Sequence, residues 1–226
     1  MGPMQIKKII RSKRKTITLQ VCDDATLIVK APFKTGDNII KQVINNHHKW
    51  LENKKKEILS RDIKYFKKKF VNGEGFLYLG QTYRLKLVNA HQPRESLALN
   101  DGYFYLQENV IDRRDAFLVW YKKKAYENIS QRVRWYAQKR GFRYHQVKIS
   151  NAQKQWGSCT HLSNLNFSWR LVMAVPAVID YVVVHELVHL IEKNHSRSFW
   201  NKVQLIIPDY EKHRNWLKKN GYLLNL

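Results

Sequence analysis

Residues 176–195 have the sequence PAVIDYVVVHELVHLIEKNH and combine an apolar helical pattern with three histidines. Pro176 suits the first turn of a helix, where the missing N–H group would have no intrahelical partner in any case. Apolar residues then recur at helical spacing, and Asn194 tolerates the left-handed conformation that ends many helices. We therefore predict one helix from Pro176 to Asn194, with His185 and His189 inside it.

The two histidines of this helix form an HExxH motif. His185 and His189 are four positions apart, so a helix places both imidazoles on one face, one turn apart. That separation suits zinc, which binds histidine nitrogens at about 2.0–2.1 Å. Glu186 lies beside this face, where its carboxylate can act as the general base toward a water that the metal activates. The motif indicates hydrolytic metal chemistry.

Two histidines leave the coordination of a metal incomplete. A zinc centre that acts on a substrate has three protein ligands and one open position. His195, six residues after His189, is the predicted third ligand. We expect Asn194 to reverse the chain through a positive φ angle so that His195 reaches the ion. Glu192 and Glu211 are the alternative third ligands, and the preference of zinc for imidazole favours His195.

Upstream of the motif, the pattern indicates a long basic helix and two strands. Apolar and aromatic residues keep helical spacing from about Asp112 to Arg140, and Gly141 is a suitable C-terminal cap. Strand patterns follow at Val147–Ser150 and Asn166–Val172.

The first hundred residues alternate between strand and helix patterns. Helical spacing from Asp37 to about Lys69 predicts one long helix or two broken helices. Asn100-Asp101-Gly102 is typical of a tight hairpin turn. Strand patterns are predicted at Thr16–Val21, Thr26–Val29 and Phe76–Leu106.

These patterns together predict an α+β fold. The chain has 226 residues, of which 44% are hydrophobic, and this is enough for one large domain or two small ones. We expect a strand-rich α+β region at residues 1–108 and a compact core with the HExxH helix at residues 109–226.

The charge and the cysteines limit the classes of partner and site. Lys and Arg number 41 against 18 Asp and Glu, a formal charge of +23 that attracts polyanions. Nucleotides and nucleic acid are therefore candidate partners, although a generally basic surface explains the charge equally well. Cys22 and Cys159 are far apart and form no CxxC pair, which excludes a cysteine zinc finger. The sequence has no signal peptide and no apolar run of about 20 residues, so we expect a cytoplasmic protein without a membrane partner.

Further short motifs surround the HExxH helix. They are Gln155–Cys159, Asn166–Leu171, Asn194–Ser196, Phe199–Trp200, Pro208–Tyr210 and Trp216–Leu217. With Val184–His189, these motifs resemble the YgjP-like metallopeptidase family, which is related by motif to SprT-like and WLM proteases. The resemblance implies a compact gluzincin-like zinc metallopeptidase core. It also implies metal ligands at His185, His189 and His195 and a catalytic base at Glu186.

Candidate substrate-binding residues lie outside the HExxH helix. A glycine in a strand marks a close backbone approach, as when a peptide adds to a sheet edge, so Trp156, Gly157 and Ser158 are candidates. A packing glycine beside a buried Trp explains the run equally well. Arg170 and Tyr210 are candidates for stabilising an oxyanion, although packing at helix ends is the favoured interpretation of both.

The leading hypothesis is a zinc metallopeptidase that acts on a peptide or protein. One alternative is a metal-dependent nucleoside triphosphate pyrophosphatase, because the same chemistry attacks a phosphoanhydride and the positive charge suits a triphosphate. The other is a basic nucleic-acid-associated module with structural zinc. The sequence leaves the substrate and the oligomeric state open.

Overall fold

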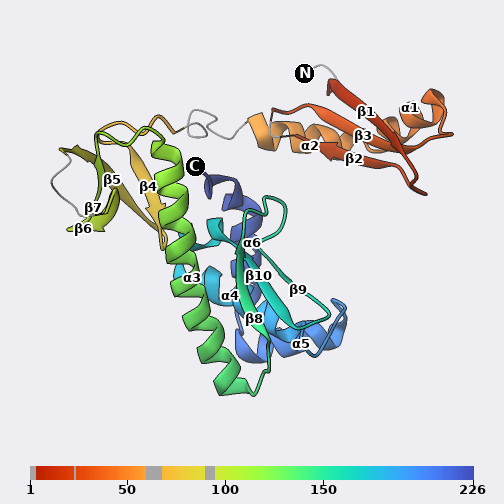
Figure 1. Cartoon of the computed structure of the whole chain (residues 1–226). Helices are drawn as coiled ribbons and strands as arrows, with labels where there is room; N and C mark the ends of the chain where they lie inside the picture. Colours follow the sequence, from red (N-terminus) through yellow and green to blue (C-terminus); the bar gives the residue numbers. More distant parts are fainter. Residues whose placement is uncertain (1–3, 23, 60–67, 90–94) are drawn as a thin grey trace. The chain divides into compact units, whose positions relative to one another are not determined.

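The computed structural model describes residues 4–22, 24–59, 68–89 and 95–226, and Figure 1 shows its elements. Contacts divide the chain into two compact units, Met1–Tyr65 and Phe66–Leu226. Within the described residues, no helix has both the length and the apolar character needed to cross a membrane. The predicted α+β class, with an N-terminal sheet followed by a helical core, is confirmed.

The first unit is a three-stranded sheet with two helices. Its elements are β1 (Ile6–Ser12), β2 (Thr18–Val21), β3 (Leu27–Pro32), α1 (Asp37–Asn46) and α2 (His48–Leu59). The strand order is β1-β3-β2, with β1 parallel and β2 antiparallel to β3. Alternate residues of β3 point toward the helices because a strand has a period of two. The resulting small core consists of Leu27, Val29, Ala31, Ile40 and Leu51.

The predicted pair of strands and the broken helix of this unit are confirmed. The helix pattern breaks at His47, the C-cap of α1. Its extension over residues 60–67 lies outside the described part of the chain, and Lys68 and Lys69 are not helical. Strand β1 was not predicted, because its exposed Lys7 and Lys8 interrupt the apolar alternation.

The second unit begins with a four-stranded sheet. Its strands are β4 (Gly75–Tyr78), β5 (Gln81–Val88), β6 (Leu97–Asn100) and β7 (Tyr103–Gln107), in the order β4-β5-β7-β6. The predicted hairpin turn joins β6 to β7, with positive φ angles of 44° at Asp101 and 79° at Gly102. Two successive positive φ angles are what a type I′ turn requires.

This sheet packs against helix α3 (Arg113–Arg140). The Phe117 ring lies 4.1 Å from the Phe76 ring and 5.1 Å from the Phe104 ring, centroid to centroid. The sheet and the helix therefore share one core, and the contacts divide the chain after Tyr65, not after residue 108. That residues 109–226 form the catalytic core stays a prediction.

Helix α3 begins and ends where the sequence predicted. Asp112 caps its first turn by accepting a hydrogen bond from the Asp115 amide at 2.8 Å. Gly141 ends it with a φ angle of 73°, a conformation that glycine adopts without steric cost.

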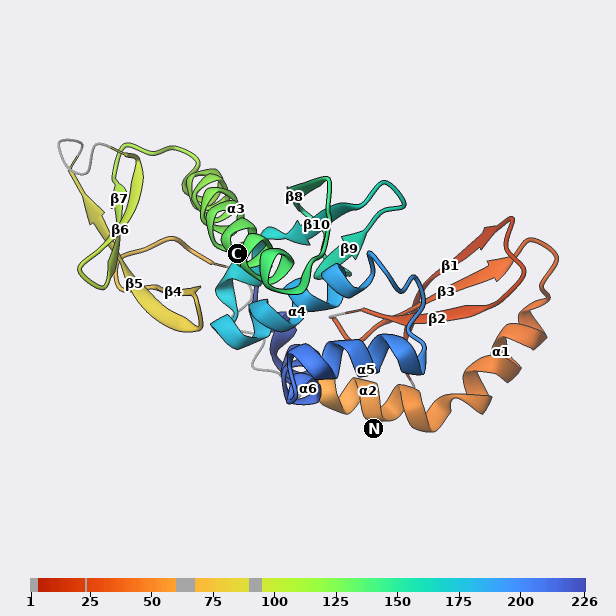
Figure 2. The same ribbon diagram turned by 90° about the horizontal axis from the view of Figure 1, so that it is seen from below.

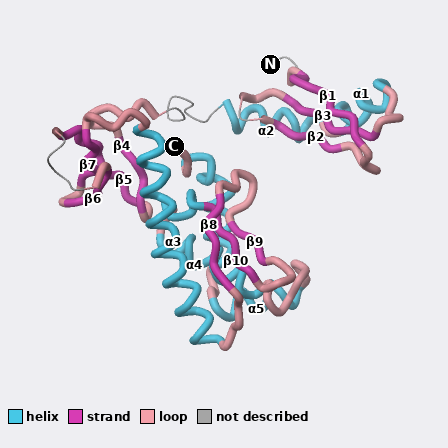
Figure 3. Tube along the Cα trace, in the orientation of Figure 1, coloured by secondary structure: helices cyan, strands magenta, loops and turns pink. Residues whose placement is uncertain are grey.

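A second small sheet follows α3, as the separate strand groups of Figure 3 show. Its strands are β8 (Gln146–Ser150), β9 (Gly157–Cys159) and β10 (Asn164–Ser168), in the order β8-β10-β9. The predicted strand Asn166–Val172 is too long, because Trp169–Met173 forms the 3-10 helix η2. The carbonyls of Val172 and Met173 accept hydrogen bonds from the amides of Leu79 and Gly80, so they take no part in this sheet.

Helix α4 (Pro176–Val188) is the buried centre of the second unit. Figure 2 shows α3 nearly end-on beside α4, with β8–β10 on one side of α4 and α5 (Arg197–Ile206) and α6 (Tyr210–Asn220) on the other. Helix α6 continues into the 3-10 helix η3 (Gly221–Leu223). A helix enclosed on all sides is apolar all round, which explains the run of valines in α4.

The predicted end of this helix is wrong. Helix α4 stops at Val188, with His189 as its C-cap, and does not continue to Asn194. The amides of Leu190 and Ile191 bond to carbonyls three residues back, at 3.1 Å in each case, which tightens the final turn. Asn194 has no positive φ angle, so the chain reverses without the left-handed cap that the sequence suggested.

Candidate metal centre

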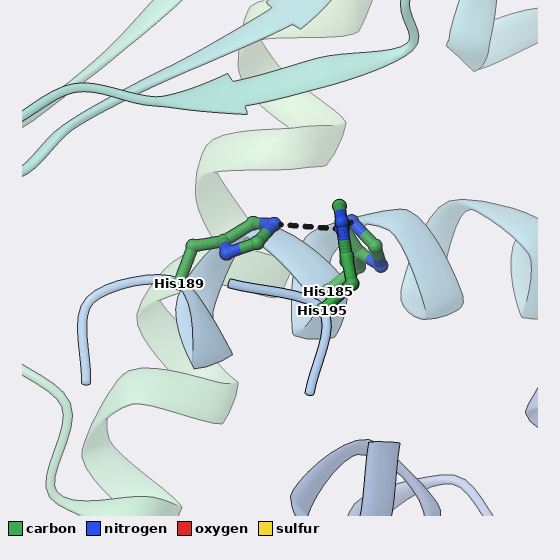
Figure 4. A group of neighbouring side chains, drawn as sticks. All are labelled: His185, His189 and His195. Carbon is green, nitrogen blue, oxygen red and sulfur yellow. Dashed lines mark hydrogen bonds between the residues drawn. The ribbon is translucent and has the colours of Figure 1, made fainter. Parts of the chain in front are cut away.

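Three imidazoles converge at the end of α4 (Figure 4). His185 lies in the last turn of α4, His189 caps it, and His195 comes from the segment before α5. The Nε2 atom of His195 lies 3.0 Å from Nε2 of His185 and 3.1 Å from Nε2 of His189. In the described part of the chain, this is the group of three metal-ligating side chains whose ligand atoms lie within 4.8 Å of one another.

One hydrogen bond and the burial of the site favour imidazoles that can coordinate a metal. The Nδ1 atom of His189 lies 2.9 Å from the Glu192 carbonyl oxygen, which can only accept, so Nδ1 carries the proton and Nε2 is free to coordinate. Burial, followed by the neighbouring His189 and His195, lowers the pKa of His185 to about 3. Burial and His189 also lower the pKa of His195. Neutral rings are the form that a metal requires.

Two aromatic residues at the start of α5 support the imidazoles. The Phe199 ring lies 4.9, 4.5 and 4.8 Å from the rings of His185, His189 and His195, centroid to centroid. Trp200 stacks on His195 at 5.6 Å. The rings thus restrict the orientations of the imidazoles and shield one side of the group from solvent.

The donor set fits a transition-metal ion. Three neutral imidazole nitrogens suit zinc and its neighbours in the first transition row, whereas magnesium and calcium prefer oxygen. Glu192, an alternative third ligand, has other partners: its Oε1 accepts hydrogen bonds from Lys202 at 2.7 Å and from Ser198 at 2.8 Å. Glu211, the other alternative, lies in the first turn of α6 and accepts a hydrogen bond from Tyr210 at 3.4 Å.

Glu186 is a buried carboxyl beside this group. It is 4% exposed, and burial raises its pKa to about 8. Its Oε2 atom has no hydrogen-bond partner within the described residues. Burial thus favours the protonated carboxyl, whereas a cation bound beside it favours the carboxylate that a general base requires.

Gly157 of β9 makes room for Glu186. A β-carbon built on Gly157 would lie 2.6 Å from both Cγ and Oε1 of Glu186, far inside van der Waals contact. The close approach that the sequence predicted at this glycine is therefore an approach to the Glu186 side chain. Any larger residue at position 157 must displace that carboxyl.

If Glu186 is the base that the sequence predicts, Gly157→Ala should lower activity at least about 10-fold while leaving metal binding intact, because a displacement of about 1 Å is enough to misplace a reacting group. Hydrolysis rate and metal content are measured on the same sample. Gly36→Ala is the matched control, since no atom lies within 4 Å of a β-carbon there. Full activity in Gly157→Ala would show that the Glu186 position is not critical.

A pocket of about 260 Å³ opens beside His185 and Glu186. Of the predicted substrate-binding residues, Trp156 and Gly157 line it. Its other lining residues were not predicted to act at the site, and they are Tyr181, Val182, Arg214, Leu217 and Lys218. Arg214 and Lys218 are two of 41 basic residues, so nothing in the sequence distinguishes them.

The remaining predicted substrate-binding residues lie outside this lining. Ser158 of β9 accepts a hydrogen bond from Asn166 at 3.4 Å. Arg170 is buried in η2 and donates to the carbonyl of Asn151 at 3.2 Å, which binds it to a nearby loop. Tyr210 is buried and stacks on Trp200 at 5.2 Å. Their roles toward an oxyanion or a substrate stay predictions.

Comparison with known proteins agrees with the motifs. The family model described as YgjP-like, metallopeptidase domain, matches residues 15–220. A solved structure, the metallopeptidase zymogen of Pyrococcus abyssi abylysin, is similar at 18% identity over 40% of this chain and 93% of its own, with a TM-score of 0.37. A likeness of that extent assigns neither fold nor function. No curated protein matches the chain.

Proposed function

The chain belongs to the YgjP-like metallopeptidase family, and we propose that it is a zinc-dependent peptidase. The three converging histidines hold the ion, and Glu186 is the general base. The observation that carries the proposal is the convergence of the three Nε2 atoms beside a buried carboxyl. Zinc is the ion that an HExxH helix with a third histidine suits best.

Different residues of the chain have different roles in the proposed hydrolysis. When bound, zinc supplies Lewis acidity that polarises the scissile carbonyl and makes water more acidic. Glu186 takes a proton from the attacking water and returns it to the leaving amine, so that one water is consumed for each peptide bond. The Glu192 carbonyl keeps His189 in the tautomer that coordinates through Nε2.

Strand β9 offers a place for the substrate backbone. It has one hydrogen-bonded neighbour, β10, among the strands of the described chain, so its other edge can receive an extended peptide. Since Gly157 of this strand contacts Glu186, a peptide on that edge passes close to the general base. This arrangement supports the predicted role of Trp156, Gly157 and Ser158 in binding substrate.

Two observations bear on the alternative functions. Arg214 and Lys218 in the pocket, with the formal charge of +23, favour a nucleoside triphosphate as the second candidate substrate. A structural zinc site has four protein ligands, whereas the group found in the described residues has three. The nucleic-acid module with structural zinc is therefore the weaker alternative.

Metal removal tests the proposal. We expect the chelated protein to lose cleavage of a denatured protein panel and to regain it with about one zinc ion per chain, because the ion supplies the Lewis acid. Release of pyrophosphate or phosphate from nucleoside triphosphates is measured with the same samples. Zinc-dependent nucleotide hydrolysis without protein cleavage would replace the peptidase assignment with the nucleotide alternative.

A further inference from the structure

Two cationic side chains of helix α6 line the pocket beside the metal centre. Arg214 and Lys218 are four residues apart, so they lie one turn apart on the same face of the helix. The same cavity is lined by His185 and Glu186 from α4. Positive charge thus lines the same cavity as a predicted metal ligand and the predicted base.

Neither cation has a carboxylate partner among the described residues. Of the nearest acids in sequence, Asp209 pairs with His213 at 3.3 Å, and Glu211 accepts from Tyr210. Arg214 instead lies with its guanidinium carbon 4.7 Å from the ring centroid of Trp200, which itself stacks on His195. This stacking restrains the guanidinium beside the metal centre and leaves its N–H groups available to a ligand.

Apart from these four polar residues, the pocket is lined mainly by aromatic and aliphatic side chains, and it is small. Trp156, Tyr181, Val182 and Leu217 supply aromatic and aliphatic surface. The volume of about 260 Å³ lies just below the usual range for ligand pockets of about 300–1,000 Å³. One amino-acid residue suits that volume better than a nucleoside triphosphate does.

We propose that Arg214 and Lys218 bind a carboxylate on the substrate residue that occupies this pocket. The carboxylate is either the α-carboxylate of a chain end or the side chain of an Asp or Glu, and both present the same planar group to a guanidinium. The inference rests on the proposed peptidase function and adds specificity to it. Cleavage is then directed to bonds beside a negatively charged residue.

The site is tested by binding, independently of catalysis. The probes are 3-phenylpropionate and its amide, titrated into zinc-loaded and metal-free protein. We expect the acid to bind at least about 10-fold more tightly than the amide in both forms of the protein. A hydrogen bond to a charged group increases affinity by about 10- to 100-fold. Arg214→Gln and Lys218→Gln are expected to remove that preference. Arg214→Lys, which keeps the charge, is expected to retain part of it.

Lys219→Gln is the matched control. It removes one positive charge from the same helix at an exposed position outside the pocket lining, so the acid should keep its affinity. An acid that binds no better than the amide, or equal loss in Lys219→Gln and Lys218→Gln, contradicts the site. A preference that is confined to the zinc-loaded form and unchanged in the variants also contradicts it, because the acid is then bound by the metal.

Paired peptides distinguish the two sources of the carboxylate. One pair differs only in a free or amidated C-terminus, and another only in Asp or Asn beside the scissile bond. We expect the acidic peptide of one pair to have at least about a 10-fold higher kcat/KM than its neutral counterpart, mainly through a lower KM. Arg214→Gln is expected to abolish this difference. Peptide cleavage without any such preference refutes the subsite and leaves the peptidase function standing. Selective acid binding without peptide cleavage supports the subsite and refutes the peptidase function.

Discussion

Glu186→Gln is expected to lower the rate of peptide hydrolysis by about 10²- to 10⁴-fold while bound zinc stays at about one per chain. Glutamine keeps the volume of the side chain but cannot accept the proton of the attacking water. Because Glu186 is buried against Gly157, the amide should remain in the same place and leave the metal ligands undisturbed. Zinc content and kcat are measured on the same preparation.

The control for this variant is Glu127→Gln, which makes the same chemical change in α3 at an exposed residue paired with Lys124 at 2.8 Å. It should keep both zinc and activity. The assignment of Glu186 as the base fails if Glu186→Gln remains fully active. It also fails if that variant loses its zinc, since the carboxylate would then be a ligand.

His195→Ala is expected to weaken zinc binding by more than about 100-fold and to abolish hydrolysis with it. Loss of residues that merely orient a ligand costs about 10- to 100-fold, so loss of a ligand should cost more. In the structure, His195 is the residue whose Nε2 lies within 3.1 Å of the Nε2 atoms of both other histidines. Zinc affinity is measured by competition with a chelator of known strength.

His161→Ala, in an exposed loop, is the control and should bind zinc as the native chain does. Glu192→Gln tests the alternative third ligand. If His195→Ala keeps its zinc and Glu192→Gln loses it, Glu192 is the ligand and the histidine is not. Because Oε1 of Glu192 already accepts hydrogen bonds from Lys202 and Ser198, we expect His195→Ala to lose zinc and Glu192→Gln to keep it.

Much of the fold was predictable because its cause is local. Asp112 and Gly141 bound helix α3 through hydrogen bonds and backbone angles within a few residues. The turn at Asp101-Gly102 depends only on residues that accept positive φ angles. The end of α4 could not be predicted in this way, because Leu190 and Ile191 are apolar and continue the helical pattern although the chain leaves the helix at His189.

The boundary between the two units also depends on distant residues. Phe76 and Phe104 lie on strands β4 and β7, and Phe117 lies on α3. Only their packing shows that the sheet of β4 to β7 belongs with α3. A change from strand to helix pattern, as at residue 108, marks a change of element and not a change of core.

The motif alone determined that His185 and His189 share one helix face beside Glu186, because a spacing of four residues is a local property of any helix. Tertiary structure decided the surroundings of that motif. It brought His195 against both imidazoles, placed Gly157 against the Glu186 carboxyl, and set Arg214 and Lys218 of α6 in the same pocket. These contacts join separate elements through packing, and no periodicity along the chain records which elements will pack together.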